Sequence, residues 1–194
     1  MKVRELFGRV FTILFRSNVA WKKIHEEPVY DSQDLLRDYA LPLIFTTVFF
    51  RLAFYGGRYQ ISLKAVIYTL IAFVILMLSL FVTSSFIHHL SPRFRSTLDR
   101  LSATKLSVYG STPIWVILFF SGTSPATLAG WLFIPIGFVY SLYLFSTGVS
   151  IMMNTPKERE AGFLGAISIT LVTIYAISFL LLKGASRALL EFPI

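Results

Sequence analysis

Long apolar stretches alternate with shorter polar segments along most of this chain. Five such stretches cover residues 39–55, 65–87, 106–120, 128–153 and 163–182. Together they contain a single charged side chain, Arg51. A helix that crosses a membrane needs about 20 predominantly apolar residues, because it must span the hydrocarbon core and satisfy every backbone group internally. Three stretches reach that length and two fall short, so we predict an all-α membrane bundle of five transmembrane helices.

Residues 3–16 show a different pattern, with polar and apolar positions on separate faces of a helix. A narrow polar arc and a wide apolar face are typical of an amphipathic helix lying on a membrane surface. A helix whose apolar face packs against the membrane domain would show the same pattern. For the first alternative, the expected membrane-interface residues are Arg9, Arg16, Trp21, Lys22 and Lys23.

The pattern divides the chain into three parts. Residues 1–38 are expected to form a cytoplasmic amphipathic helix followed by an acidic linker, since five acidic side chains lie between residues 24 and 38. That acidic strip is interpreted as a solvated linker, with partner or cation binding as the alternative. Residues 39–182 form the predicted transmembrane domain, and residues 183–194 a short external tail.

The distribution of charge mainly indicates how the chain is oriented in the membrane. The net charge is +8, and most of the 18 basic residues fall on the inner side if the amino terminus is cytoplasmic. This asymmetry fits the positive-inside rule, with the carboxyl terminus outside. Nucleic-acid binding is disfavoured, because the basic residues are strung along membrane edges and are not gathered with stacking aromatics.

The residues offer little catalytic chemistry. No acidic residue lies in any of the five stretches, the three histidines lie outside or at their edges, and cysteine is absent. Serine, histidine and aspartate do occur near the inner end of the second stretch, but without a spacing characteristic of a hydrolase. We therefore predict a non-enzymatic protein with no cofactor and no metal site.

A cavity inside the bundle is the alternative source of function. Proline at 113 and 135 removes a backbone donor from each of two predicted helices and can open space between them. Arg51 either extends toward the headgroups or serves as a buried cation. The residues proposed to line such a cavity are Arg51, Tyr68, Pro135 and Tyr143.

Four short motifs follow one another in chain order. They are Trp-Lys-Lys-Ile at 21–24 with Glu26, Asp-Tyr-Ala-Leu-Pro-Leu at 38–43, Ser-Val-Tyr-Gly-Ser-Thr-Pro at 107–113, and Tyr-Ser-Leu-Tyr at 140–143 with Gly148 and Asn-Thr-Pro-Lys at 154–157. In this order they resemble the motifs of the Yip1 family of integral membrane proteins, and its bacterial branch in particular. The family-motif positions are Tyr39, Pro42, Tyr109, Pro113 and Tyr140.

The resemblance implies five spans with a cytoplasmic amino terminus and location in a bacterial inner membrane. Ala40 and Leu41 replace the glycine-centred motif of the family. Eukaryotic members are implicated in trafficking with Rab GTPases, and the short acidic linker gives little basis for carrying over Rab binding. We predict a membrane organiser or adaptor whose partners are anionic lipids, other membrane proteins or a second copy of itself. The rival hypothesis is a channel or transporter for a small solute or lipid that is not coupled to protons.

Overall fold

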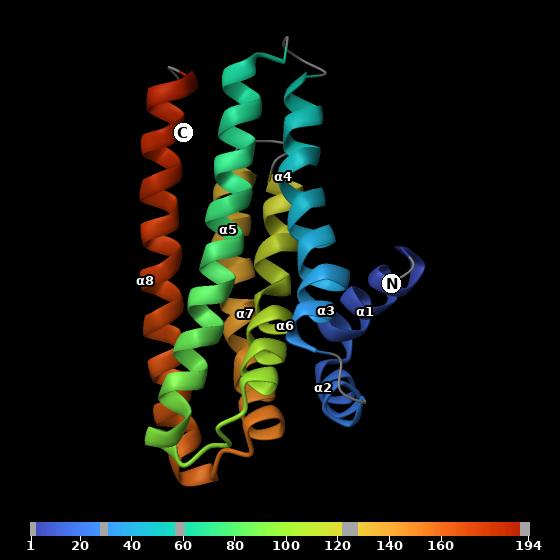
Figure 1. Ribbon diagram of the computed structural model, residues 1–194, viewed down its shortest axis with the longest axis vertical. Coiled ribbons are helices and arrows are strands. Elements are labelled where there is room, and N and C mark those ends of the chain that lie inside the picture. Colours follow the sequence, from blue (N-terminus) through green and yellow to red (C-terminus); the bar gives the residue numbers. More distant parts are fainter. Residues whose placement is uncertain (1–2, 28–30, 57–60, 122–127, 191–194) are drawn as a thin grey trace.

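The computed structural model describes residues 3–27, 31–56, 61–121 and 128–190 (Figure 1). Within these residues every regular element is a helix, which confirms the predicted all-α class. In chain order the elements are α1 (Val3–Phe15), α2 (Ser17–Glu26), α3 (Ser32–Leu35), the π-helical turn η1 (Leu36–Ala40), α4 (Leu41–Gly56), α5 (Leu63–Leu90), the 3-10 turn η2 (Ser91–Phe94), α6 (Arg100–Ser121), α7 (Leu128–Met153) and α8 (Lys157–Leu190).

Three of the described helical segments are long and apolar enough to cross a membrane. They are Leu63–Phe94, Phe133–Met153 and Lys157–Leu189. These segments lie on α5 with η2, on α7 and on α8, where the apolar pattern predicts three of its five spans. The chain is therefore an integral membrane protein with helical spans.

The two remaining predicted spans fall on helices of a different character. The stretch 39–55 lies on η1 and α4, and α4 has only 16 residues. The stretch 106–120 lies within α6, where residues 103–115 are all buried inside the protein. A helix surrounded by other helices need not be uniformly apolar, because its polar side chains face protein and not lipid. The count of five spans stays a prediction.

The centre of the bundle is a close contact between α6 and α7. A Cβ added at Gly110 would lie 2.7 Å from the ring of Phe145, and one at Gly137 would lie 2.8 Å from Ile117. The hydroxyl of Ser141 donates a hydrogen bond to the carbonyl oxygen of Gly110. Small residues permit this approach, as expected for helices that associate in a membrane.

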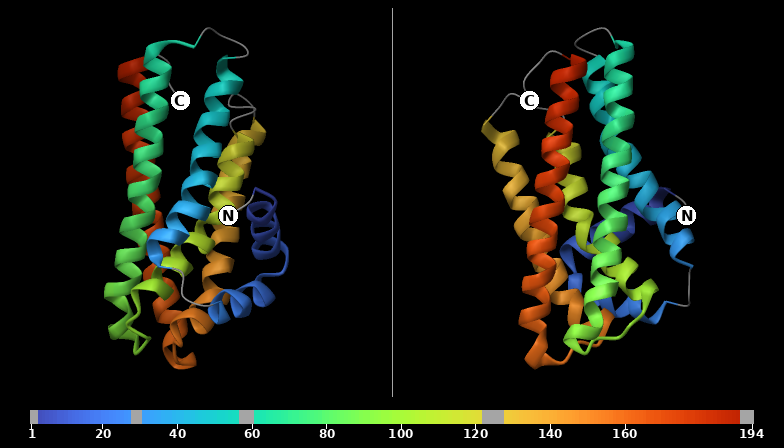
Figure 2. Two further views of the ribbon diagram at one scale, coloured as in Figure 1. Left: turned by 45° about the vertical axis from the view of Figure 1, so that its right-hand side comes forward. Right: turned by 60° about the vertical axis from the view of Figure 1, so that its left-hand side comes forward.

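Helices α5 and α8 run side by side along the long axis of the molecule (Figures 1 and 2). Their outer faces expose aliphatic side chains, including Leu78 at 56% and Ile169 at 71%. The Ser79 and Ser178 hydroxyls form a 2.8 Å hydrogen bond between the two helices. An apolar exterior of this kind requires lipid around it.

The tail predicted at 183–194 is helical as far as it is described, because α8 continues to Leu190, and 191–194 lie outside the described residues. At the opposite end of the bundle, η2 leads from α5 toward α6 and Asp99 caps α6. The Asp99 carboxylate accepts hydrogen bonds from the amides of Leu101 and Ser102 at 3.2 and 2.9 Å and from the Ser102 hydroxyl at 2.6 Å. Burial favours a higher pKa for Asp99, but these donors outweigh it and hold the pKa below its ordinary value.

Candidate functional site

Helices α1 and α2 fold back against the side of the bundle and form what we call the N-terminal hook, residues 3–27 (Figure 2). Ile13 on α1 and Trp21 and Ile24 on α2 are buried against the bundle. Of the two alternatives for residues 3–16, the structure therefore shows packing of one apolar face on the membrane domain. A second apolar face remains exposed, with Phe7, Phe11 and Phe15 projecting from α1; we call these three residues the phenylalanine ridge.

Arg9 connects the two helices of the hook to α6. Its Nη2 donates a 3.0 Å hydrogen bond to one Glu27 carboxylate oxygen, and its Nη1 lies 3.0 Å from the other oxygen in an ion pair and donates to the Tyr109 hydroxyl at 2.9 Å. The Arg9 and Glu27 side chains are 33% and 20% exposed, so the pair is partly shielded from water. Burial lowers the pKa of Arg9, but Tyr109 and Glu27 outweigh burial and the pKa rises above its ordinary value. The guanidinium of Arg9 is thus directed at Glu27 and Tyr109 while the side chain stays partly exposed, and its predicted contact with the membrane surface stays a prediction.

Lys105, on α6, contacts the last turn of α2 near the end of the hook. Its ammonium donates to the carbonyl oxygen of Ile24 at 2.9 Å in a buried position. The carbonyl oxygens in the last turn of a helix lack hydrogen-bond donors within the helix. A cation there supplies a donor to one of them and also interacts favourably with the negative end of the helix dipole. Burial lowers the pKa of Lys105, while Glu27 and Asp99 act in the opposite direction without cancelling the shift.

Trp21 anchors α2 inside the molecule. The side chain is 0% exposed, its indole Nε1 donates to the Thr147 hydroxyl at 3.1 Å, and Gly148 leaves room for the ring. The prediction that Trp21 lies among lipid headgroups is therefore corrected, because α7 and Tyr109 surround its indole. Arg16, Lys22 and Lys23 are exposed, as a surface position requires, and their contact with membrane stays a prediction.

Two family-motif tyrosines meet at the base of the hook. The rings of Tyr39 and Tyr109 lie 4.7 Å apart between centroids, and the Tyr39 hydroxyl forms a 3.0 Å hydrogen bond with that of Thr112. Tyr140 contacts the hook separately, because its hydroxyl donates to the carbonyl oxygen of Leu14. Pro42 lies in the first turn of α4, and Pro113 lies inside α6.

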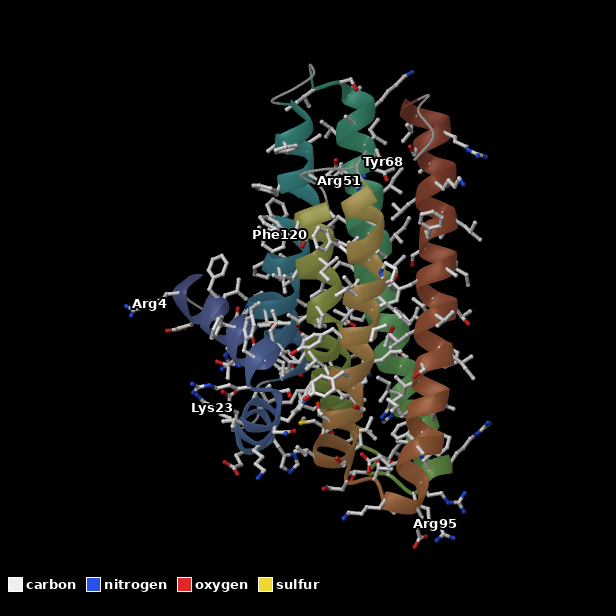
Figure 3. All side chains as sticks on the ribbon, turned by 180° about the vertical axis from the view of Figure 1, so that it is seen from behind. Arg4, Lys23, Arg51, Tyr68, Arg95 and Phe120 are labelled. Atoms are coloured by element: carbon white, nitrogen blue, oxygen red, sulfur yellow. The ribbon has the colours of Figure 1, made fainter. Side chains whose placement is uncertain are left out.

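The four residues proposed to line a bundle cavity do not come together. Arg51 and Tyr68 lie near each other, far from the hook (Figure 3). Pro135 is exposed on α7, and Tyr143 is 47% exposed with its hydroxyl 3.5 Å from that of Ser17. Between α6 and α7, bulky side chains fill the space beside the glycines, with Phe145 against Gly110 and Ile117 against Gly137.

Two cavities lie beside the Arg9–Glu27 pair. One of about 410 Å³ lies between α1, α2 and α6. Another of about 150 Å³ lies toward α3 and η1, and Lys105 and Tyr39 contribute to its lining. Sequence reasoning did not find Glu27 or Lys105, because neither residue stands in a motif and each faces Arg9 or Ile24 only after folding.

The described residues contain no cluster of three or more histidine, aspartate and glutamate side chains able to hold a metal ion. His88 and His89 are neighbours on α5 with perpendicular rings 5.5 Å apart. The charged side chains of Arg9 and Glu27, which both line the cavities, form an ion pair with each other. This arrangement can fix the hook and orient groups around a cavity, and no nucleophile with an adjacent base lies among the described residues that line it.

A comparison with known protein families identifies the family of this chain. The family model described as Yip1 domain matches residues 11–180. The chain belongs to the Yip1 family. The Yip1 domain thus begins within α1 and ends within α8, so it includes Trp21, Glu27 and all five family-motif positions. Comparisons with curated proteins and with solved structures give no match.

Proposed function

We propose that this Yip1-domain protein is a non-enzymatic membrane organiser or adaptor that engages lipid through the exposed side of its hook. The observation that carries the proposal is the phenylalanine ridge. Phe7, Phe11 and Phe15 are 65%, 61% and 70% exposed, although the opposite side of α1 is packed. Burying one such side chain in lipid contributes about 1.5–3 kcal/mol, which supports a membrane-inserting role.

Exposed cations accompany the ridge. Arg4, Arg16, Lys22 and Lys23 are all exposed on the hook, and Figure 3 shows Arg4 pointing away from the bundle. A juxtamembrane cation near anionic lipid contributes about 1 kcal/mol. These charges support anionic lipid as the preferred surface and a cytoplasmic position for the hook.

The finer features of this proposal rest on the motif resemblance, the five apolar stretches and the charge asymmetry of the sequence. We take the protein to be a member of the bacterial branch, in the inner membrane, with five spans and the carboxyl terminus outside. Other membrane proteins, or a second copy of this chain, are further proposed partners. An open surface at Gly165 on α8, where a Cβ would meet nothing within 4 Å, supports close approach of another helix there.

Packing of the bundle favours the organiser over a channel or transporter. Between α6 and α7 the Phe145 ring fills the space over Gly110, and Ile117 fills the space over Gly137. A conducting path needs polar groups lining a continuous opening. A flux assay in liposomes with ions, small solutes and labelled lipids is expected to show no movement above protein-free vesicles.

The lipid contact can be tested by placing an environment-sensitive dye on single cysteines, because the natural chain has none. The full-length Phe11→Cys variant would be labelled in nanodiscs that contain either neutral or anionic lipid. We expect a blue-shifted emission that spin-labelled lipids quench, with a larger shift in anionic nanodiscs. Lys157→Cys, exposed beyond the end of α7, provides the water reference, and Leu180→Cys, 65% exposed on α8, provides the lipid reference. A Phe11 signal equal to that of Lys157 would contradict the proposal.

A further inference from the structure

The larger cavity beside Arg9 is lined by charges of both signs. Arg9 and Lys23 contribute the cations, and Glu5 and Glu27 contribute the carboxylates. Its volume of about 410 Å³ lies within the range of small-molecule sites, roughly 300–1,000 Å³. Gly8 forms part of the wall, and a Cβ added there would meet no atom within 4 Å, so this wall faces open space.

We infer that this cavity binds the headgroup of a zwitterionic phospholipid with a primary amine, phosphatidylethanolamine. Its phosphate is an acceptor for the Lys23 ammonium, and its own ammonium can donate up to three hydrogen bonds to carboxylates such as Glu27. A choline headgroup carries the same charges but has no N–H to donate. A glycerol headgroup carries a phosphate but no ammonium, so it has no cation to offer to Glu5 or Glu27.

The arrangement of α1 places this cavity where a lipid headgroup would lie. At 100° per residue, Gly8 and Thr12 project from a face adjacent to the phenylalanine ridge, and the packed face around Ile13 lies on the far side. Acyl chains that contact the ridge would bring their headgroup alongside the cavity. The inference thus rests on the proposed function, because it needs α1 at the membrane surface.

The ion pair within the cavity gives the site its shape. Both carboxylate oxygens of Glu27 are held by Arg9, which is itself held by Tyr109. A carboxylate fixed in this way keeps lone pairs free for a second donor, since each oxygen can accept more than one hydrogen bond. We assign Arg9 a positioning role and Lys23 direct contact with the phosphate.

The test is native mass spectrometry of the delipidated full-length protein, titrated with phosphatidylethanolamine, phosphatidylcholine and phosphatidylglycerol of identical acyl chains. We expect phosphatidylethanolamine to bind about tenfold more tightly than phosphatidylcholine, the effect of one charge-assisted hydrogen bond. Gly8→Trp should fill the cavity and remove this preference. Gly165→Trp, at an equally open glycine on α8, should keep it.

Lys23 and its neighbour provide a second, milder comparison. Lys23→Gln should weaken phosphatidylethanolamine binding about tenfold, because the phosphate loses its cation. Lys22→Gln, at an exposed lysine on the same helix that does not line the cavity, should leave the preference for phosphatidylethanolamine over phosphatidylcholine unchanged. Both substitutions lie on the surface, so folding is not at risk. Equal binding of the two zwitterionic lipids by the natural protein, or a preference that survives Gly8→Trp, would overturn the inference.

Soluble competitors distinguish a site for the whole headgroup from a site for phosphate alone. Glycerophosphoethanolamine is expected to displace the lipid, whereas inorganic phosphate at the same concentration is not. Equal displacement by phosphate would reduce the cavity to a simple anion site and overturn the inference. Failure of the proposed function is distinguishable, because a water-exposed Phe11 dye contradicts membrane insertion, while a shielded dye with no lipid preference contradicts only the headgroup site.

Discussion

The N-terminal hook and the α5–α8 pair are attached to the rest of the molecule in different ways. The hook is held by polar contacts to side chains and backbone, among them Arg9 with Tyr109, Lys105 with the Ile24 carbonyl, and Trp21 with Thr147. Helices α5 and α8 pack mainly through apolar side chains, with the Ser79–Ser178 hydroxyl contact between them.

This difference reflects two environments, the lipid around α5 and α8 and the water at the membrane surface near the hook. In lipid, apolar surfaces gain nothing by leaving the solvent, so helices associate through packing and a few small hydroxyl bonds. At the membrane surface, water competes for every polar group, and a contact contributes most when its partners are shielded. The partly buried Arg9–Glu27 pair meets that condition. The hook is therefore held by shielded polar contacts together with buried apolar side chains such as Trp21, whereas α5 and α8 are held mainly by packing.

Removal of the Trp21 side chain should give the largest effect. Trp21→Ala deletes a fully buried indole, which costs about 3–5 kcal/mol, and should release the hook without unfolding α5 and α8. Hydrogen exchange of the α2 amides in nanodiscs would then accelerate by roughly a hundredfold or more. Phe11→Ala, which truncates an exposed aromatic of the same hook, should leave α2 exchange nearly unchanged. Equal effects of the two substitutions would break the comparison.

The Arg9–Glu27 pair should show a coupling of about 1.5–3 kcal/mol in a double-mutant cycle with Arg9→Met and Glu27→Gln. The measurement is again the opening free energy of α2 from hydrogen exchange. The reference cycle uses Arg37 and Asp34, an ion pair at 2.8 Å whose side chains are 70% and 39% exposed. Read from the amides of α3 and η1, where it lies, this exposed pair should show a much smaller coupling. Similar couplings would mean that shielding has no influence at the hook.

Acid should weaken the cap of α6 at the water-facing end of the bundle. The folded pKa of Asp99 lies below its ordinary value, so its contribution is complete above that ordinary value and is lost as the pH falls through the folded pKa. Asp99→Ala should cost about 1 kcal/mol at neutral pH. Asp99→Asn keeps an acceptor that does not titrate, so the stability advantage of the natural protein over this variant should shrink on acidification. Thermal unfolding across a pH series measures this difference, and a pH-independent difference would contradict the assignment.

The hydroxyl contact between α5 and α8 should give the smallest effect. Ser178→Ala should cost about 0.6 kcal/mol in unfolding experiments in mixed micelles, because the contact is weak in the membrane interior. Ser168→Ala is a matched control on α8. Both hydroxyls donate to the carbonyl four residues earlier at 2.8 Å, but Ser178 also reaches Ser79. A loss at Ser178 larger than that at the Arg9–Glu27 pair would reverse the order of the two attachments.

The lengths of the apolar stretches predicted the long membrane helices well. The stretches 65–87, 128–153 and 163–182 all fall on α5, α7 and α8, because a lipid-facing helix must be apolar along its own length. The stretch 106–120 marks only part of α6, which begins at Arg100. Its inner end carries polar side chains that neighbouring helices bury, and a hydropathy pattern cannot distinguish protein from water around such a helix.

The candidate site was predictable in its residue types and not in its contacts. Motif resemblance singled out Tyr39 and Tyr109, which the structure brings into contact. The amphipathic pattern placed Arg9 and Trp21 at the membrane surface, where cations and indoles are common, although Trp21 is buried and the Arg9 guanidinium is directed at Tyr109. Glu27 lay in an acidic linker without any feature to distinguish it from its neighbours.

By itself the sequence determined that this chain is helical, lies in a membrane and belongs with Yip1-like proteins, because lipid imposes its demands residue by residue along each span. Tertiary structure alone decided which polar side chains became internal. Arg9 and Tyr109 are 100 residues apart, and Trp21 and Thr147 are 126 residues apart. Such partners are selected when the hook folds against α6 and α7, because burial makes their mutual hydrogen bonds preferable to those with water.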